Sequence, residues 1–349
     1  MCPWPLLSAH LLGNQAVHTS HGEPFAHLSP DTILTAVEQA AQVRCTGYCL
    51  QLNSYINRVY EVETEAGNRL IVKFYRPDRW SLAALKEEHD FVSELDRLEL
   101  PVVAAMPLAT GSSLAVVRDI HFALYPKRSG RFFDEFSRQQ WQELGRLIGR
   151  MHAVSATRPC RHRPILTPDQ ATRKQIDTLL AGDFMPPHQQ RSFSSVCHDL
   201  LELITPLFRD TTLIRLHGDC HFGNILHRAE ESFLLIDFDD MAMGPAVQDF
   251  WMLLPGYRDE CHEEIDNFIQ GYETFRPFPR QELLLIEPLR AMRYIHFIAW
   301  CAHQAHDKKS SQSLMSDWGS EQYWSQEIID LQSQINRIAQ AADSSHSPY

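Results

Sequence analysis

The stretch H-G-D-C-H-F-G-N at residues 217–224, followed by F-L-L-I at 233–236 and an aspartate at 237, is the strongest indication of the fold in this sequence. Asp219 and Asn224 belong to one predicted loop, and Asp237 ends a predicted apolar strand. Phosphoryl transfer requires a carboxylate that orients or deprotonates a hydroxyl, together with oxygen ligands for magnesium. This stretch therefore predicts a phosphotransferase in which Asp219 and Asp237 are catalytic, and Asn224 and Asp237 hold Mg²⁺.

The spacing D-x-x-x-x-N, followed by an aspartate at a strand end, is also that of the protein-kinase catalytic loop and its metal ligand. His217 then takes the position of the first histidine of that loop, where we expect it to fix the loop by packing and hydrogen bonding. The alternative is an ordinary surface loop, because Asp and Asn favour turns. Several ordered matches along the chain favour the catalytic interpretation.

Strand-like runs dominate the first third of the chain, and helical spacing dominates the rest. The runs 56–62 and 69–75 alternate around the turn A-G-N at 66–68 and predict a hairpin; further strands are predicted at 113–118 and 121–125. After the break at 126–131 we expect helices at 137–153, 192–208, 259–275, 281–302 and 321–341, with short strands near 213–216 and 233–236. The pattern predicts an α+β protein with a poorly ordered leader at 1–24, a nucleotide-binding lobe at 25–126, and a catalytic and substrate lobe at 127–349.

The predicted hairpin also carries candidate nucleotide ligands. Lys73 on its second strand is expected to pair with the α- and β-phosphates of ATP, and Glu88 on the next helix is expected to hold that lysine. Glu87 stays open as the alternative partner. Ser54, in the turn before the hairpin, is expected to contact phosphate with backbone N–H groups, although the G-x-G-x-x-G of kinase loops is absent.

Composition excludes several classes of protein. The formal charge of −12 opposes nucleic acid as a partner, because binding to a polyanion requires a basic face. No uncharged apolar run approaches the roughly 20 residues of a membrane helix. The eight cysteines are scattered, which is typical of reduced thiols in a cytoplasmic protein. A metal-binding or redox protein that uses the 18 histidines and eight cysteines is the rival from another class, since His217, Cys220 and His221 are near neighbours. However, there is no C-x-x-C pair, and C-T-G-Y-C at 45–49 has no matching His or Cys pair at zinc-finger spacing.

The residues after Asp237 depart from a protein kinase. They read F-D-D-M-A-M-G-P-A-V-Q-D, which leaves no room for a long activation loop, and no A-P-E element follows. A helix is expected to begin near Pro245. Asp249 in its first turn either braces the catalytic loop through hydrogen bonds or is an ordinary first-turn acid.

These departures, H-G-D for H-R-D and I-D-F-D-D for D-F-G, resemble the aminoglycoside phosphotransferase and choline-kinase group, which has a two-lobed protein-kinase-like fold. Within that group, V-K-F-Y-R-P-D-R-W and G-P-A-V-Q-D-F-W-M-L-L look like the bacterial stress response kinases, over about residues 25–340. The resemblance implies an ATP- and Mg²⁺-dependent cytoplasmic monomer that phosphorylates serine and threonine in proteins, including itself. It makes Asp219 the proton acceptor, Asn224 and Asp237 the magnesium ligands and Ser54 a nucleotide contact. The leader before residue 25 is not shared.

A kinase for small molecules is the main rival, because the same fold serves choline-, homoserine- and sugar-like substrates. Such a site is expected to offer an aromatic cage beside the base. Four residues supply candidate rings: Trp251, Tyr257, Trp300 and Trp324. The roles of Arg290 and Arg293 stay open, as does that of Cys220 next to Asp219, where oxidation is one hypothesis.

Overall fold

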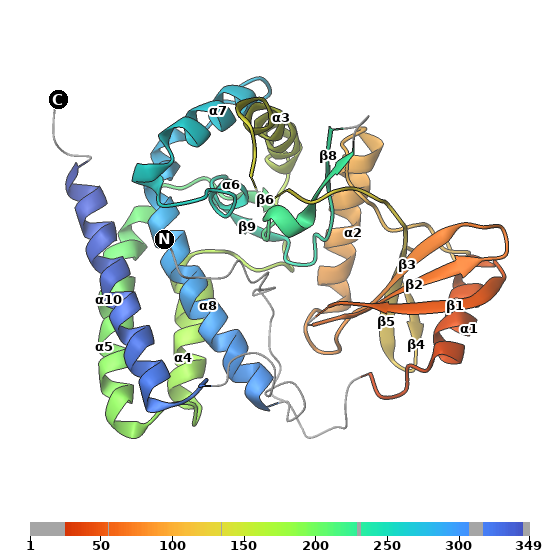
Figure 1. Ribbon diagram of the computed structural model, residues 1–349, viewed down its shortest axis with the longest axis horizontal. Coiled ribbons are helices and arrows are strands. Elements are labelled where there is room, and N and C mark those ends of the chain that lie inside the picture. Colours follow the sequence, from red (N-terminus) through yellow and green to blue (C-terminus); the bar gives the residue numbers. More distant parts are fainter. Residues whose placement is uncertain (1–24, 55, 134, 229–231, 307–316, 345–349) are drawn as a thin grey trace.

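The computed structural model describes residues 25–344 except 55, 134, 229–231 and 307–316. The leader predicted at 1–24 lies outside these residues. The chain forms a strand-rich N-terminal lobe and a larger, mainly helical C-terminal lobe (Figure 1). None of the described helices is long and apolar enough to span a membrane.

The N-terminal lobe is built on one antiparallel sheet with the strand order β1-β2-β3-β5-β4. Its strands are β1 (Cys45–Leu52), β2 (Arg58–Thr64), β3 (Arg69–Phe74), β4 (Ala115–Val117) and β5 (Ile120–Pro126). The predicted hairpin is confirmed as β2 and β3, and Lys73 pairs in register with Val59 and Ala123. Strand β1 was not predicted, because its burial does not alternate with a period of two.

Two helices flank this sheet. Helix α1 (Pro30–Ala41) begins after Ser29, whose side chain accepts a hydrogen bond from the N–H of Thr32 and caps the helix. Helix α2 (Leu82–Arg97) lies between the sheet and the helical lobe (Figure 1). Its apolar residues join the core of the helical lobe, so α2 connects the two parts of the molecule.

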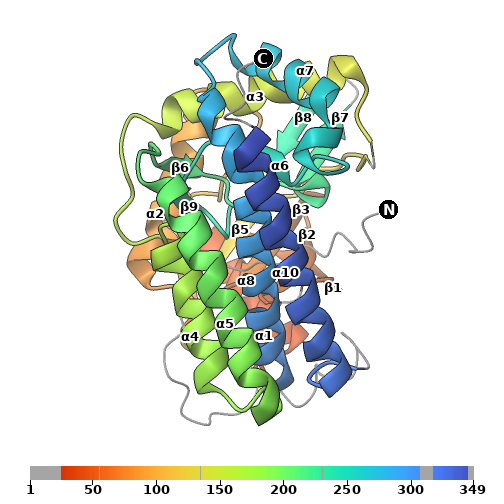
Figure 2. The ribbon, with the colours of Figure 1, turned by 90° about the vertical axis from the view of Figure 1, so that its left-hand side faces the viewer.

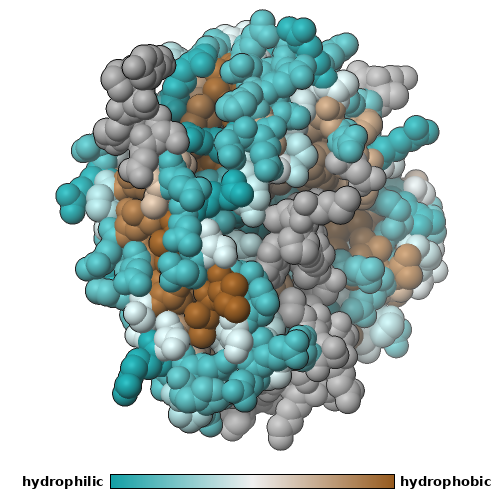
Figure 3. Space-filling view, turned by 60° about the vertical axis from the view of Figure 1, so that its left-hand side comes forward, coloured by the Kyte–Doolittle hydropathy of each residue, from teal (hydrophilic) through white to brown (hydrophobic). Residues whose placement is uncertain are grey.

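The C-terminal lobe contains helices α3 (Arg138–Ser155), α4 (Arg173–Ala181), α5 (Pro187–Ile204), α6 (Gln248–Trp251), α7 (His262–Tyr272), α8 (Ile286–His306) and α10 (Glu321–Ser344). Short turns of 3₁₀ or π type lie at Pro168–Thr172, Thr205–Phe208, Phe222–Asn224, Arg258–Glu260 and Arg280–Leu285. Helices α4, α5, α8 and α10 stand side by side as a bundle (Figure 2). The surface on this side is largely hydrophilic, with apolar patches between the polar side chains (Figure 3).

Helix α5 differs from its predicted bounds, 192–208, at both ends, because prolines lie at its start and just beyond its end. Helix α5 begins five residues before the predicted 192, at Pro187, because proline suits the first helical position. It ends at Ile204, where Pro206 has no N–H to continue the ladder and a 3₁₀ turn follows. Helix α4 was not predicted.

Two small ladders surround the motif at 217–224. Strand β6 (Ile214–Leu216) pairs with β9 (Ala242–Gly244), and β7 (Ile225–Arg228) pairs with β8 (Ser232–Leu235). The structure confirms the two short strands that were predicted, β6 and β8, and adds their partners. Because each ladder ends at the motif, both deliver polar side chains to the same place.

Candidate active site

Asp249 holds the backbone of the catalytic loop. Its Oδ2 accepts a hydrogen bond from the N–H of His217 at 2.7 Å, and its Oδ1 accepts one from the N–H of Gly218 at 2.8 Å. His152 on α3 places Nε2 3.1 Å from the same carboxylate. Asp249, His152 and His217 are all fully buried. Of the two roles left open for Asp249, these hydrogen bonds show the first, a brace on the catalytic loop.

Gly218 is required by the close approach of another chain segment. Its φ is +87°, and a Cβ at this position would stand 2.0 Å from the carbonyl oxygen of Asp240. Only glycine combines that backbone conformation with that contact. Nε2 of the His217 ring donates a hydrogen bond to Ile236 O at 2.9 Å, as the structural role predicted for it requires.

Asp219 is nearly inaccessible and is surrounded by polar groups. Its Oδ2 lies 3.3 Å from Nε2 of His221, and its Oδ1 accepts a hydrogen bond from Arg293 at 3.2 Å. Nδ2 of Asn224 donates to the main-chain oxygen of Asp219 at 2.9 Å. The loop therefore fixes both the backbone and the carboxylate of Asp219.

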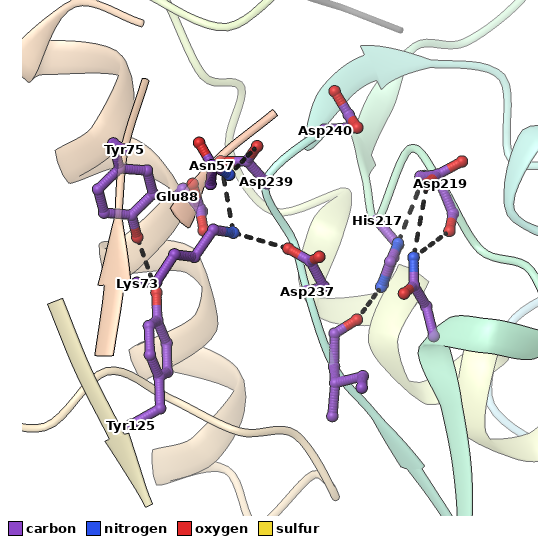
Figure 4. Close-up of polar contacts among 12 residues, drawn as sticks. Asn57, Lys73, Tyr75, Glu88, Tyr125, His217, Asp219, Asp237, Asp239 and Asp240 are labelled. Atoms are coloured by element: carbon purple, nitrogen blue, oxygen red, sulfur yellow. Dashed lines mark hydrogen bonds and ion pairs between the residues drawn. The ribbon is translucent and has the colours of Figure 1, made fainter. Parts of the chain in front are cut away.

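Asn224 and Asp237 meet at one end of the β7–β8 ladder. The register pairs Ile225 with Leu235, and the N–H of Ile236 donates to Asn224 O at 3.0 Å. Asp237 follows with a left-handed backbone, φ +62°, which aspartate tolerates better than most residues. Figure 4 shows its side chain between Lys73 and the catalytic loop.

Lys73 reaches this loop from the sheet. Its Nζ lies 2.7 Å from Oδ1 of Asp237 and 3.5 Å from Oδ1 of Asp239. Burial lowers the pKa of Lys73, but the carboxylates of Asp237, Asp239 and Glu88 outweigh it and hold that pKa well above its usual range. The lysine is thus a permanent positive charge beside the predicted metal ligands.

The expected ion pair between Lys73 and Glu88 is replaced by the pair with Asp237. Glu88 is buried, but the cation that it approaches most closely in the described chain is Arg163, with Nη1 at 3.8 Å. Burial raises the pKa of Glu88 to about 7. Glu87 turns away and accepts hydrogen bonds at 2.7 Å from the N–H groups of Arg161 and His162. Of the two acids left open, Glu88 is the one that acts on Lys73, through its charge.

Comparison with known proteins agrees with this geometry. The pattern described as the phosphotransferase enzyme family (APH) matches residues 49–284, which is more than half of the chain. The chain belongs to the phosphotransferase enzyme family.

Relatives of this phosphotransferase are bacterial kinases. It is 37% identical to stress response kinase A of Salmonella choleraesuis and to serine/threonine protein kinase RdoA of Salmonella typhimurium, over 86% of this chain and 90% of each relative. It is 36% identical to stress response kinase A of Escherichia coli K12, with the same coverage.

Solved structures with the same fold include the amicoumacin kinase hAmiN in complex with AMP-PNP, Ca²⁺ and Ami. Its TM-score is 0.71 at 19% identity, and the match covers 91% of this chain and 96% of that one. The choline kinase LicA from Streptococcus pneumoniae has a TM-score of 0.62 at 14% identity, with 88% and 98% covered. These similarities confirm the predicted two-lobed, kinase-like fold.

The residues of this phosphotransferase fit a magnesium ion and a nucleotide phosphate. Asn224 and Asp237 offer amide and carboxylate oxygens, the hard donors that Mg²⁺ prefers. The Asp237 side chain is 31% exposed, so it is open to a ligand although it pairs with Lys73. Lys73 supplies the charge that a phosphate requires. Ser54 lies on the loop between β1 and β2, three residues before Asn57, whose Nδ2 donates to Asp239 at 3.0 Å.

The sequence analysis did not predict a buried ionic cluster around the two acids that follow Asp237. Arg79, from the loop between β3 and α2, contacts the carboxylates of both Asp239 and Asp240. Arg163 donates to the main-chain oxygen of Asp239 and lies over the ring of Trp80, 3.9 Å from its centroid. Two consecutive acids after Asp237 were the available signal, because buried carboxylates require cationic partners.

The structure also places the residues whose roles were open. Cys220 is fully buried, and burial, with Asp249 and Asp219, raises the pKa of its thiol well above the usual range. Its thiol is thus protonated and shielded, which argues against the oxidation hypothesis. Arg290 bonds to Glu287 and to the main chain, whereas Arg293 enters the site.

Proposed function

We propose that this phosphotransferase is an ATP- and Mg²⁺-dependent serine/threonine protein kinase of a bacterial stress response, which also phosphorylates itself. The observation that carries the proposal is the convergence of Asp219, Asn224 and Asp237 with Lys73 between the two lobes. Figure 4 shows three of these residues, Lys73, Asp219 and Asp237. The names of the relatives, stress response kinase A and serine/threonine protein kinase RdoA, support the acceptor class. We further propose a cytoplasmic monomer, with a nucleotide-binding lobe at 25–126 and a catalytic lobe at 127–349.

Each residue then has a defined task. Asp219 orients the acceptor hydroxyl and takes its proton, because its carboxylate is fixed on the catalytic loop. Asn224 and Asp237 hold the ion that neutralises the phosphates. Lys73 and Ser54 contact the nucleotide, and Glu88 keeps Lys73 charged from the buried side of α2. Catalysis then consists mainly of positioning and of electrostatic stabilisation.

A kinase for small alcohols is the second candidate, because the structural neighbours include antibiotic and choline kinases. The rings proposed for a cage do not favour it. Trp324 is buried, with its indole N–H donating to Phe184 O at 2.8 Å, and Trp251 is buried and donates to Gln248 at 2.9 Å. Tyr257 packs against the guanidinium of Arg337. At least these three rings serve the fold.

Purified protein incubated with γ-labelled ATP and Mg²⁺ tests both candidates. The panel contains the protein alone, general protein substrates, and choline, homoserine and sugars. We expect label on serine and threonine of the protein itself and of protein acceptors, and an Asp219→Ala variant should lose about 10²–10⁴-fold in rate. Faster labelling of a small alcohol would replace the protein-kinase proposal, and an unimpaired Asp219→Ala variant would remove Asp219 from the mechanism.

A further inference from the structure

Arg293 on α8 contacts the proposed base directly. Its Nη1 lies 3.2 Å from Oδ1 of Asp219, and its side chain keeps 23% of its surface exposed, against 2% for Asp219. Asp219 is the hydrogen-bond partner of this guanidinium within the described part of the chain. Because a guanidinium carries five N–H donors, most of them remain for a ligand.

The neighbouring arginine of the same helix shows that this placement is specific. Arg290, one turn earlier on α8, donates from Nε to Glu287 at 3.1 Å and from Nη2 to Gly256 O at 2.9 Å. It also lies over the ring of Trp251, with 5.1 Å to the centroid. The guanidinium of Arg290 thus stabilises the fold through Glu287 and Gly256, whereas the guanidinium of Arg293 contacts Asp219, the proposed base.

An arginine beside the transferred phosphoryl group accelerates phosphoryl transfer in other enzymes, because it stabilises the charge that develops on the equatorial oxygens. Lys73 and its carboxylate partners lie on the nucleotide side. Next to Asp219, His221 accepts a hydrogen bond at Nδ1 from the N–H of Gly223, and its Nε2 faces Asp219. Burial and Arg293 lower the pKa of His296, one turn further along α8, to about 3, so it is neutral. Among the described side chains that contact Asp219, Arg293 is thus the guanidinium, which carries a permanent charge.

We propose that Arg293 is a catalytic residue of the transfer, which donates hydrogen bonds to the oxygens of the phosphoryl group as it passes to the acceptor. The inference rests on the function proposed above. An acceptor hydroxyl bonded to Asp219 lies about 2.7 Å from the carboxylate and about 3–3.5 Å from the attacked phosphorus. A guanidinium that already touches this carboxylate is therefore within reach of the phosphoryl oxygens.

The acceptor oxygen forms a bond to the γ-phosphorus, and the bond from that phosphorus to the bridging oxygen of the β-phosphate breaks. The electron pair of the broken bond stays on ADP, and the hydroxyl proton passes to Asp219. Arg293 shares its donors between Asp219 in the resting enzyme and the phosphoryl oxygens during transfer, so its charge is used where negative charge moves toward the acceptor.

The test compares Arg293→Met and Arg293→Lys with the matched control Arg290→Lys on the same helix. Transfer from γ-labelled ATP, ATP affinity and the unfolding temperature are measured for each full-length protein. We expect Arg293→Met to lower kcat by about 10²-fold or more, as the loss of a donor to a developing charge does elsewhere. The KM for ATP should stay within about threefold, because Lys73 and the metal ligands are intact. Arg293→Lys should retain more activity than Arg293→Met. Arg290→Lys should keep the wild-type kcat, although the loss of the bonds from Nε and Nη2 should lower its unfolding temperature.

A further Arg293→Ala variant separates catalysis from folding. Added guanidinium ion at millimolar concentration should restore part of its rate, which a purely structural role would not allow. The inference is overturned if Arg293→Met transfers phosphate within threefold of the wild type. It is also overturned if the variants lose ATP affinity and thermal stability in parallel with kcat and show no rescue. A wild-type protein that transfers no phosphate to any acceptor would instead remove the proposed function.

Discussion

Replacing Asp249 with asparagine tests the brace on the catalytic loop most directly. The carboxylate receives the N–H groups of His217 and Gly218 at 2.7 and 2.8 Å, and His152 Nε2 lies 3.1 Å away. Asparagine has one side-chain oxygen, so at the least the Gly218 N–H loses its acceptor and faces an NH₂ group. A hydrogen bond to a charged group contributes about 1.5–3 kcal/mol, and a buried donor without an acceptor costs about 1–3 kcal/mol. We expect the free energy of unfolding to fall by about 2–4 kcal/mol.

Thermal unfolding and steady-state transfer measure this effect. The unfolding temperature should fall by roughly 4–16 °C, since each kcal/mol lowers it by about 2–4 °C in a large domain. Turnover should fall at least tenfold, because the loop also carries Asp219. Asp266→Asn, which changes an exposed acid on α7, is the control and should leave both quantities unchanged. An Asp249→Asn protein with wild-type stability and turnover would refute the reasoning that these hydrogen bonds set the loop.

The remaining predictions concern other parts of the molecule. Asp237→Asn keeps a residue type that tolerates φ +62° but removes the carboxylate. In nucleotide titrations with and without Mg²⁺, binding should therefore lose most of its dependence on the ion. Binding that keeps its full dependence on Mg²⁺ would exclude Asp237 as a ligand. Gly218→Ala should abolish transfer, because the new Cβ meets Asp240 O at 2.0 Å; normal turnover would show that the loop can move. Burial raises the pKa of Glu327 on α10 from 4.5 to about 7, so the folded state binds this proton more tightly than the unfolded state does. The protein therefore loses stability as the pH rises from about 4.5 to about 7. In chemical denaturation, Glu327→Gln should gain free energy of unfolding relative to the wild type at pH 8 but not at pH 5, and the same difference in free energy at both pH values would contradict the raised pKa.

Local sequence patterns were sufficient for most secondary structure and for the catalytic loop. The hairpin β2–β3 follows from alternation around a glycine turn, and α1 follows from Ser29 and Pro30 at its start. The brace by Asp249 was one of two roles considered from the sequence, because Asp249 lies in the first turn of the helix that follows Asp237. It is 31 residues from Gly218 and 32 residues from His217, the two residues whose N–H groups it accepts. Strand β1 and helix α4 were missed, since the packing of neighbouring elements outweighed their weak periodicity.

The order of residues along the chain is enough to place Asp219, Asn224 and Asp237 near one another, because one loop and one short β-ladder connect them within 19 residues. Which cation pairs with which carboxylate depends instead on tertiary packing. Lys73 pairs with Asp237 across 164 residues, and Arg293 reaches Asp219 across 74. Such pairs depend on how the sheet and α8 pack against the catalytic loop, and no short-range pattern encodes that packing. This is why an expected partner of Lys73, Glu88, gave way to Asp237, whose carboxylate lies closer.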